Sequence, residues 1–521
     1  MEYAIDLYSG IGGWTMGMKL SDVENIASYE WWQEANQTHN FNFNTQHKEF
    51  NIRELVAENL HYEHPIDFVV GSPPCTQFSF ANKGGNGDIA DGLIDIYKFL
   101  EVVEHLQPKY WAMENVPRVA KILEEETKHG SLQRFRSLFK VIEVINSADY
   151  GVPQSRKRMI AGNFPWKLFQ SYQQKIQKVS LGFVLNTLQQ EVIIDPNYGY
   201  EMPRYEVTEL ENEVDLTPQE ERINRDAKTY HPIYNKMSFP DKLDRPSRTI
   251  TATCTRVSRE SIIIQSKTGF RRLNVRERGV IQGFPITYQF YGKTLNSKFK
   301  MIGNAIPPIL TYYIFQSMKE TALSELKSPK LATYKHRRPK YNSRPSNLGF
   351  PKRKFPARRR FQFAVPNLRY GSGVRFELSN NPRVENTPWS FKFYYGSSKN
   401  IKQIELNDQL KLLLAPVVNT HKNEFINLHI KEIEEKFSTI NSKTLQSKWT
   451  SKKANNEVFH FLDAVGNSAN KIFQDAVLTD SDMTFMNEII QQRNKKIEKN
   501  KKSILIGFYL LSNLNQKLLD T

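Results

Sequence analysis

The first twenty residues follow a pattern that few folds use. The apolar run Tyr3–Tyr8 predicts a strand, Ser9–Gly13 predicts a tight turn, and Trp14–Leu20 has the spacing of a helix. This order lets the backbone approach a nucleotide closely, with a helix N-terminus beside the ligand. The glycines do not follow GxGxxG, so a dinucleotide is not specially favoured. The pattern predicts an α/β fold with a ligand at the ends of its strands.

A second short strand, Ile26–Tyr29, ends in Glu30 and Trp31. An acid at this position suits ribose hydroxyls, and an indole beside it can stack on adenine. Each feature is weak alone, because glycine turns and exposed acids are common. Together they indicate a ligand that contains adenosine.

The segment Gly71–Ser79 reads GSPPCTQFS and contains Cys75, one of two cysteines in the chain. It follows the apolar strand 67–70, and its Pro-Pro turn cannot become helical. A thiol there lies at the strand ends where α/β folds do chemistry. On the cysteine alone, a small buried hydrophobic residue is the favoured interpretation.

Eight blocks follow one another along roughly residues 1–325, about three fifths of the chain. They read DLYSGIGG, YEW, SPPCTQFS, MENVP, QSRKR, RPSRTITA, VRERGVIQGFP and GNAIPP. In this order they closely resemble the DNA cytosine-5 methyltransferase family. The resemblance implies a Rossmann-like, class I fold that uses S-adenosylmethionine as methyl donor.

The resemblance also implies a catalytic set. Cys75 would add to C6 of a cytosine flipped out of the duplex, which makes C5 nucleophilic. Glu114 would supply a proton or strong hydrogen bond at N3. Arg156 and Arg158 would direct donor forks toward the cytosine, a phosphate or Glu114, and would lower the pKa of the thiol. Without the resemblance, a solvated basic face is the favoured interpretation of the two arginines.

Cofactor positions carry over in the same way. They are Tyr8, Gly10, Ile11, Gly12, Gly13, Glu30, Trp31, Asn51, Ile52, Pro74, Asn304 and Ala305. Asn51 stands where the family often has aspartate, but its amide oxygen can still accept a bond from the adenine amino group. Thr76 stands where the family usually has glutamine. We expect Gln77 and Ser79 to contact nucleic acid, and Thr76 leaves the mode of strand engagement open.

Composition agrees with an enzyme that acts on a polyanion. The chain has 521 residues, a net charge of +17 and a sequence pI near 9.4, so we expect double-stranded DNA as partner. Two cysteines argue against a disulfide scaffold and fit a reducing cytoplasm. No signal peptide is expected before the first strand, and no apolar run is long enough to span a bilayer. We expect no metal and a monomer, with cognate restriction or defence proteins as further partners.

Five regions are expected. They are a catalytic core (1–164), a target-recognition insert (165–245), a return to the core (246–326), a basic linker (327–360) and a C-terminal accessory domain (361–521). The insert is short and acidic between Glu201 and Glu221, so it is not an obvious DNA-reading surface. A simple structural connection is the alternative.

The basic linker holds 13 Lys or Arg, five prolines and no acid. Such repulsion disfavours compact structure, and neutralising phosphates would give salt-dependent binding. The residues expected to contact DNA are Lys352, Arg353, Lys354, Arg358, Arg359 and Arg360. A basic linker without a specific partner is the alternative.

Beyond the linker, residues 361–406 alternate apolar and polar side chains, which predicts a β-rich module, and the periodicity from 407 onward is helical. This part has no PD-(D/E)xK arrangement, no HNH set and no Cys/His metal cluster. A DNA-binding accessory domain and a protein-docking module both stay open, and basic charge slightly favours the first.

The expected function is methylation of cytosine C5 in DNA, in a restriction–modification or phage-defence system. A tRNA cytosine-5 methyltransferase would use the same chemistry, but the Cys-Phe-Thr tripeptide typical of that branch is absent. A catalytically inactive DNA-binding homologue is disfavoured, because Cys75, Glu114, Arg156 and Arg158 are all present.

Overall fold

The computed structural model describes residues 1–78, 87–211, 213–229, 237–330, 355–371, 373–397, 400–407, 423–451, 457–475 and 495–519. The chain forms two compact units. The first unit comprises Met1–Asp215 and Pro240–Ser346, and the second unit comprises Leu216–Phe239 and Asn347–Thr521.

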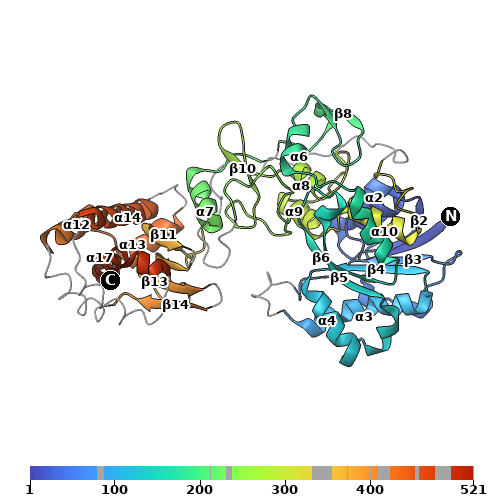
Figure 1. Ribbon diagram of the computed structural model, residues 1–521, viewed down its shortest axis with the longest axis horizontal. Helices are drawn as coiled ribbons and strands as arrows, with labels where there is room; N and C mark the ends of the chain where they lie inside the picture. Colours follow the sequence, from blue (N-terminus) through green and yellow to red (C-terminus); the bar gives the residue numbers. More distant parts are fainter. Residues whose placement is uncertain are drawn as a thin grey trace. The chain divides into compact units, whose positions relative to one another are not determined.

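A six-stranded sheet is the centre of the first unit (Figure 1). Its strands are β1 (Glu2–Leu7), β2 (Val23–Tyr29), β3 (Phe68–Gly71), β4 (Tyr110–Asn115), β5 (Val141–Asn146) and β6 (Lys157–Gly162). Their order is β2-β1-β3-β4-β6-β5, and β6 alone runs antiparallel to its neighbours. This is the mixed, mainly parallel sheet expected from the sequence.

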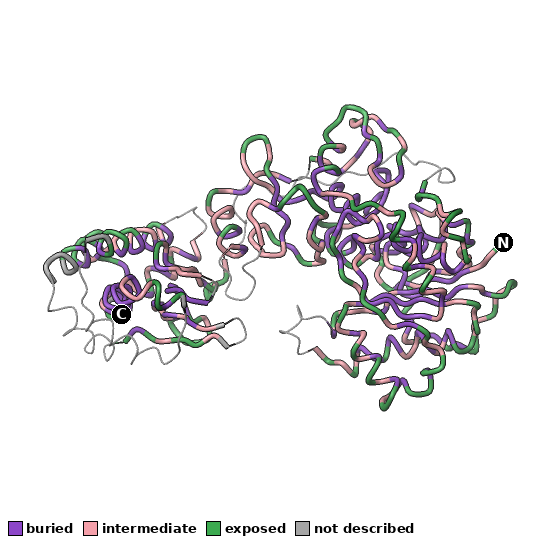
Figure 2. Tube along the Cα trace, viewed as in Figure 1, coloured by how far each residue is buried: buried purple, intermediate pink, exposed green. Residues whose placement is uncertain are grey.

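Helices lie on both faces of the sheet (Figure 1), whose strands are largely buried (Figure 2). Alternating side chains of the strands belong to two separate apolar clusters. Ala4 and Val70 face one cluster, and Ile5 and Val69 face the other. The first cluster includes residues of α1 (Gly13–Leu20), α5 (Trp166–Ser171) and α10 (Pro308–Met318); the second includes residues of α3 (Ile89–Leu106) and α4 (Arg118–His129). A sheet covered on both faces leaves its strand ends as the accessible place for a ligand.

Late parts of the chain complete the first unit. They contain α6 (Leu181–Thr187), β7 (Val192–Ile194), β8 (Glu201–Pro203), β9 (Ile263–Gln265), β10 (Phe270–Arg272), α8 (Val275–Ile281) and α9 (Leu295–Asn304). Asp195 joins the recognition insert to this part, because its carboxylate accepts hydrogen bonds from the backbone N–H of Ile286 (2.7 Å) and Asn197 (2.8 Å). A buried carboxylate is stable here because backbone donors replace its water.

The second unit contains a four-stranded antiparallel sheet and helices. The sheet has the order β11 (Gln362–Gly371), β12 (Val374–Asn380), β13 (Trp389–Ser397) and β14 (Asn400–Glu405). The helices are α7 (Pro218–Thr229), α12 (Asn423–Lys436), α13 (Ser442–Thr450), α14 (Glu457–Asp475), α16 (Lys495–Lys499) and α17 (Lys501–Leu519). Aromatic rings fill its core: Phe361 lies 4.7 Å from Trp389, and Phe393 lies 4.9 Å from Phe508, centroid to centroid.

Candidate active site

The loop that carries Cys75 is fixed just beyond the end of β3. Asn115, at the end of the neighbouring strand β4, donates a hydrogen bond from Nδ2 to the carbonyl oxygen of Pro73 (3.1 Å). The Trp14 indole donates to Ser72 Oγ (3.0 Å). These bonds hold the chain on both sides of the sheet end, and the Cys75 side chain remains partly exposed. Asn115 was not singled out from the sequence, although it lies inside the MENVP block.

Glu114 and Arg158 form an ion pair beside this loop. Glu114 is on β4 and Arg158 is on β6, the antiparallel neighbour of β4. Arg158 Nε lies 2.8 Å from Glu114 Oε1, and the two side chains are 14% and 6% exposed. A pair so largely removed from water has a fixed geometry. The contact between Arg158 and Glu114 is an ion pair, and its part in catalysis stays a prediction.

The charges around Cys75 raise the pKa of its thiol. Burial is the largest cause, and the negative charge of Glu114 adds to it. Arg158 and Arg156 lower the pKa but do not outweigh these two effects. The two arginines thus lower the pKa of the thiol, as their positive charge predicts, but desolvation and the Glu114 carboxylate together have the larger effect.

Arg156 has a different position from the one expected. It is 1% exposed, and its Nη1 donates to the carbonyl oxygen of Ile250 (3.1 Å). Its Nη2 donates to the carbonyl oxygens of Gly303 (2.9 Å) and Ala305 (3.3 Å). A planar fork is well suited to several carbonyls at once. Because both terminal nitrogens are used in this way, Arg156 connects the QSRKR block to the late blocks instead of presenting a fork to a base.

Two buried glutamines extend this connection. Gln154 donates to Gln282 Oε1 (2.6 Å) and accepts from the backbone N–H of Ile250 (2.8 Å). Gln282 donates in turn to the carbonyl oxygen of Ala305. Both glutamines lie in blocks that carry the family resemblance, but the sequence predicted no role for them. Gln282 alone offered a signal, as a polar residue that follows the apolar pair Val280 and Ile281.

The glycine turn after β1 folds back toward Glu30. Gly10 and Gly12 have φ angles of 54° and 85°, where a side chain would be strained. The Glu30 carboxylate accepts hydrogen bonds from the backbone N–H of Gly10 (2.9 Å) and Trp32 (2.8 Å). Burial raises the pKa of Glu30, and these backbone donors oppose that rise. The adjacent Trp31 is 66% exposed, so its indole is available for stacking.

Other expected cofactor residues surround this turn. A Cβ on Gly13 would lie 2.3 Å from the carbonyl oxygen of Ile306, so the first block contacts the last directly. Ile11 is buried, and its carbonyl oxygen accepts a hydrogen bond from Tyr288. The Tyr8 hydroxyl donates to the Asp95 carbonyl oxygen (3.0 Å) on α3, so this hydroxyl group is engaged within the protein, and the contact of Tyr8 with the cofactor stays a prediction.

The segment with Asn51 lies beside Glu30, because the N–H of Phe50 donates to the Glu30 carbonyl oxygen (2.9 Å). Asn51 Oδ1 accepts from the N–H of Arg53 (3.2 Å) and caps a short helical turn, while Ile52 is 3% exposed within the core. The amide oxygen of Asn51 keeps a second acceptor position. Pro74 and Ala305 are partly exposed, and Asn304 is exposed at the end of α9.

Residues expected to contact nucleic acid have mixed positions. Gln77 donates to Asp91 Oδ2 (3.0 Å) and accepts from the N–H of Asp88 (3.0 Å), so its amide is bound to the start of α3. Arg359 lies between the rings of Phe355 (3.8 Å) and Trp449 (3.7 Å), which is a packing position.

Four further predictions of nucleic-acid contacts lie outside the described residues: Ser79, Lys352, Arg353 and Lys354. Arg358 and Arg360 are exposed. Arg360 donates to Gln362 Oε1 (2.6 Å).

The second cysteine has a separate environment. Cys254 is 5% exposed; its Sγ lies 3.0 Å from Ser261 Oγ and accepts a hydrogen bond from Arg278 (3.1 Å). Burial alone would raise the pKa of Cys254, but Arg278, Ser261 and Arg272 outweigh burial and lower it. The pKa direction thus favours Cys254 as a nucleophile, whereas exposure favours Cys75, which is partly exposed while Cys254 is buried.

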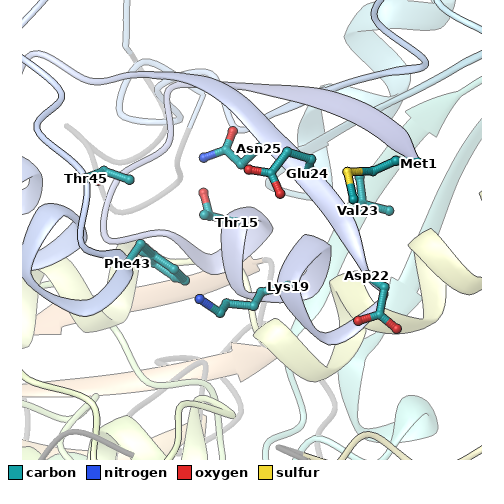
Figure 3. Close-up of a pocket in the computed structure, with 9 residues that line it drawn as sticks. All are labelled: Met1, Thr15, Lys19, Asp22, Val23, Glu24, Asn25, Phe43 and Thr45. Atoms are coloured by element: carbon teal, nitrogen blue, oxygen red, sulfur yellow. The ribbon is translucent and has the colours of Figure 1, made fainter. Parts of the chain in front are cut away.

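A pocket of about 310 Å³ lies away from these residues (Figure 3). It is lined by Met1 and Val23 at the starts of β1 and β2, by Lys19 at the end of α1, and by Phe43 at the end of α2 (Gln33–Phe43). In the described part of the chain, no group of His, Cys, Asp and Glu could hold a metal ion. No described helix is long and apolar enough to cross a membrane.

Comparison with known proteins places this geometry in a family. The chain is 25% identical over 346 residues to the Type II methyltransferase M.FnuDI of Fusobacterium nucleatum, with 63% of this chain and 96% of the relative covered. It is 29% identical over 342 residues to the Type II methyltransferase M1.HphI of Haemophilus parahaemolyticus, with 62% and 87% covered. The solved structure of S. pombe Dnmt2 methyltransferase is 16% identical with a TM-score of 0.43, and covers 61% of this chain and 99% of its own. Residues 3–320 match the profile of the C-5 cytosine-specific DNA methylases. The chain therefore belongs to the C-5 cytosine-specific DNA methylase family and is a DNA cytosine-5 methyltransferase.

Proposed function

We propose that the protein methylates C5 of cytosine in double-stranded DNA, with S-adenosylmethionine as donor, through a covalent bond between Cys75 and C6 of a flipped base. One observation carries the proposal. Cys75 and the Glu114–Arg158 pair lie at the carboxyl ends of the adjacent strands β3 and β4, and the Glu30–Trp31 turn lies at the same edge of the sheet. A nucleophile, a proton donor and an adenosine site are thus brought to one edge.

The first chemical step forms a bond between Cys75 sulfur and C6. The electron pair of the C5–C6 double bond moves toward C5, and negative charge develops at N3 and O2. Glu114 is placed to take up a proton from solvent and pass it to N3, and Arg158 fixes the orientation of the Glu114 carboxyl group. Once C5 has received the methyl group, a base removes the C5 proton. The electrons of that C–H bond restore the double bond and expel the Cys75 thiolate.

The raised pKa of Cys75 has a consequence for this sequence of events. The negative charge of Glu114 is one of its causes. When Glu114 takes up the proton that it passes to N3, that charge is reduced and the thiolate becomes easier to form. Base binding and thiol activation are therefore coupled through one carboxyl group, which keeps the thiol unreactive before a cytosine enters.

The residues after β1 and β2 fit a cofactor that contains adenosine and a charged amino-acid end. Ser9 Oγ is buried and has no hydrogen-bond partner within the described chain, and a Cβ at Gly10 would meet nothing within 4 Å. Each Glu30 oxygen already accepts one backbone N–H and can accept another donor, such as a ribose hydroxyl. Bound S-adenosylmethionine supplies the electrophilic methyl group. Trp31 would stack on its adenine, and the Asn51 amide oxygen would accept from the adenine amino group.

Restriction–modification is the context that we infer for this activity. The two relatives named above are Type II methyltransferases, and the chain spans most of their length. A methyltransferase in such a system protects host DNA at the sites that a cognate nuclease would cut.

Bisulfite sequencing tests the function directly. DNA from cells that express the full chain should resist conversion at cytosines within one short sequence, and DNA from cells with Cys75→Ala should not. RNA from the same cells should show no dependence on Cys75. Protected cytosines in tRNA together with fully converted DNA would contradict the proposal.

A further inference from the structure

The recognition insert does not stay within the first unit. Residues Leu216–Phe239, in the middle of the insert, belong to the second unit together with the C-terminal part of the chain. The chain therefore passes between the units three times, and the linker is only one of the three connections. A C-terminal appendage on a tether would need a single connection.

Local hydrogen bonds define where the helix α7 of this segment begins. The backbone N–H of Thr217 donates to Glu220 Oε2 (2.9 Å), and the N–H of Glu220 donates back to Thr217 Oγ1 (3.3 Å). This is the reciprocal arrangement of a capping box, and Pro218 occupies the first helical position. Acids in the first turn also match the helix dipole. The local sequence thus specifies a helix at this place, in an otherwise irregular insert.

An ion pair fixes α7 to α14. Arg222 donates from Nη1 and Nη2 to the two carboxylate oxygens of Asp463, both at 2.7 Å. The same guanidinium lies 4.3 Å from the centroid of the Phe459 ring, one turn earlier on α14. Bidentate pairing combined with stacking on a ring restricts the guanidinium far more than an ordinary surface pair does.

Further groups on α7 support the same contact. Asp226, one turn after Arg222, has its pKa raised to about 6 by burial, and it is influenced by Arg222, Arg369 of β11 and Arg225. Ile223 and Asn224 are buried. Residues of the insert are thus part of the folded second unit.

Charge indicates what this unit binds. Residues 347–521 contain 28 Lys or Arg and 16 Asp or Glu, an excess of 12 positive charges out of the net +17 of the chain. Excess positive charge of this size favours a polyanion and releases counterions on binding. We propose that the second unit is a DNA-binding part of the enzyme, and that the Arg222–Asp463 contact couples it to the recognition insert. The proposal rests on the proposed function only in taking DNA as the substrate.

The physical gain is an increase in effective concentration. Two DNA-binding parts that are linked within one chain engage one duplex with higher affinity than either alone, and the gain falls when fewer or longer connections link them. Breaking the Arg222–Asp463 contact should therefore weaken DNA binding by the full chain without changing the cofactor site.

A charge swap in the full-length protein tests this. DNA affinity is measured by fluorescence anisotropy on a random-sequence duplex, and S-adenosylhomocysteine affinity by calorimetry. Arg222→Asp should weaken DNA binding about tenfold and leave S-adenosylhomocysteine affinity unchanged. Arg222→Asp combined with Asp463→Arg should recover most of the loss. Arg225→Asp is the matched control, because Arg225 is exposed on the same helix and pairs with Glu221 within it.

Limited proteolysis between residues 327 and 360 tests the Arg222–Asp463 contact in the absence of DNA. With the linker cut and the insert intact, Arg222→Asp should release a separable C-terminal fragment, because α7 no longer holds α14, and the charge swap should suppress that release. Equal DNA affinity in Arg222→Asp and Arg225→Asp would overturn the DNA role. If Arg222→Asp and the wild type give the same fragments, the role of the Arg222–Asp463 contact in holding α7 on α14 is overturned. Because the duplex is of random sequence, DNA binding without methylation would count against the proposed function alone.

Discussion

The Arg158 guanidinium lies 2.8 Å from the Glu114 carboxylate, and Glu114 in turn raises the pKa of the Cys75 thiol. The three groups therefore form one electrostatic unit in which the carboxyl group is central. Its charge opposes thiolate formation, and the arginines oppose the carboxylate. Any group that removes charge from Glu114 promotes the nucleophile.

Neutralising Glu114 should lower the pKa of Cys75. In Glu114→Gln the negative charge that raises this pKa is gone, so the pH midpoint for alkylation by iodoacetamide should move to lower pH. Arg158→Gln removes a charge that lowers the pKa, so its midpoint should move to higher pH. Both measurements use a Cys254→Ser background, in which Cys75 is the remaining cysteine. Equal alkylation midpoints in Glu114→Gln and Arg158→Gln would show that the charge of Glu114 does not control the pKa of the Cys75 thiol.

Removing the exposed indole should weaken cofactor binding. Trp31→Ala should reduce the binding free energy of S-adenosylmethionine by about 1–3 kcal/mol, because a stacked ring and its buried area are lost. Calorimetry measures the change. Phe183→Ala is the control, since Phe183 is also an exposed aromatic residue (54% exposed) but lies in the insert. Equal affinities in a folded Trp31→Ala protein would remove the adenine site from this place.

Arg156 should be needed for the assembly of the late blocks. Arg156→Lys keeps the positive charge but loses the fork that reaches three carbonyl oxygens, so the free energy of unfolding should fall by about 1–3 kcal/mol in urea denaturation. Methylation should fall with it through kcat, because the connection between the QSRKR and GNAIPP blocks loosens. A stable, fully active Arg156→Lys protein would mean that the carbonyl contacts are dispensable.

The basic linker should contribute phosphate contacts. Replacing Lys352, Arg353 and Lys354 with Gln should reduce the slope of log affinity against log salt by about 2–3. The control replaces three exposed lysines of the first unit, Lys121, Lys128 and Lys140. Identical slopes in the wild type and the linker variant would exclude these three residues as phosphate contacts. Arg359 is left in place, because it packs against Trp449.

The sheet and the positions of Cys75 and Glu114 were predictable from the sequence for a simple reason. Short apolar runs followed by polar or glycine residues predict strands with functional residues at their carboxyl ends. Parallel strands bring these ends to one edge of the sheet. The order of the blocks then placed the thiol and the carboxyl group on adjacent strands. These inferences need only local sequence and a topology.

Three features could not be predicted in this way. Arg156 contacts carbonyl oxygens 94 to 149 residues away, and any backbone can accept such a bond, so no side-chain signal marks the partner. The pKa of Cys75 depends on the balance between burial and opposing charges, which motifs do not give. The place of α7 in the second unit depends on packing against parts of the chain far away in sequence, such as the contact of Arg222 with Asp463, 241 positions later.

The most direct test of the account is covalent capture of Cys75. A duplex that contains the methylated sequence is prepared with 5-fluorocytosine at the target position, where the C5 substituent cannot leave as a proton. With S-adenosylmethionine present, the wild type and Cys254→Ala should both form a protein–DNA adduct that survives denaturing electrophoresis. Cys75→Ala should form no adduct and should not methylate DNA. An adduct that maps to Cys254, or methylation that continues in Cys75→Ala, would contradict the assignment of the nucleophile.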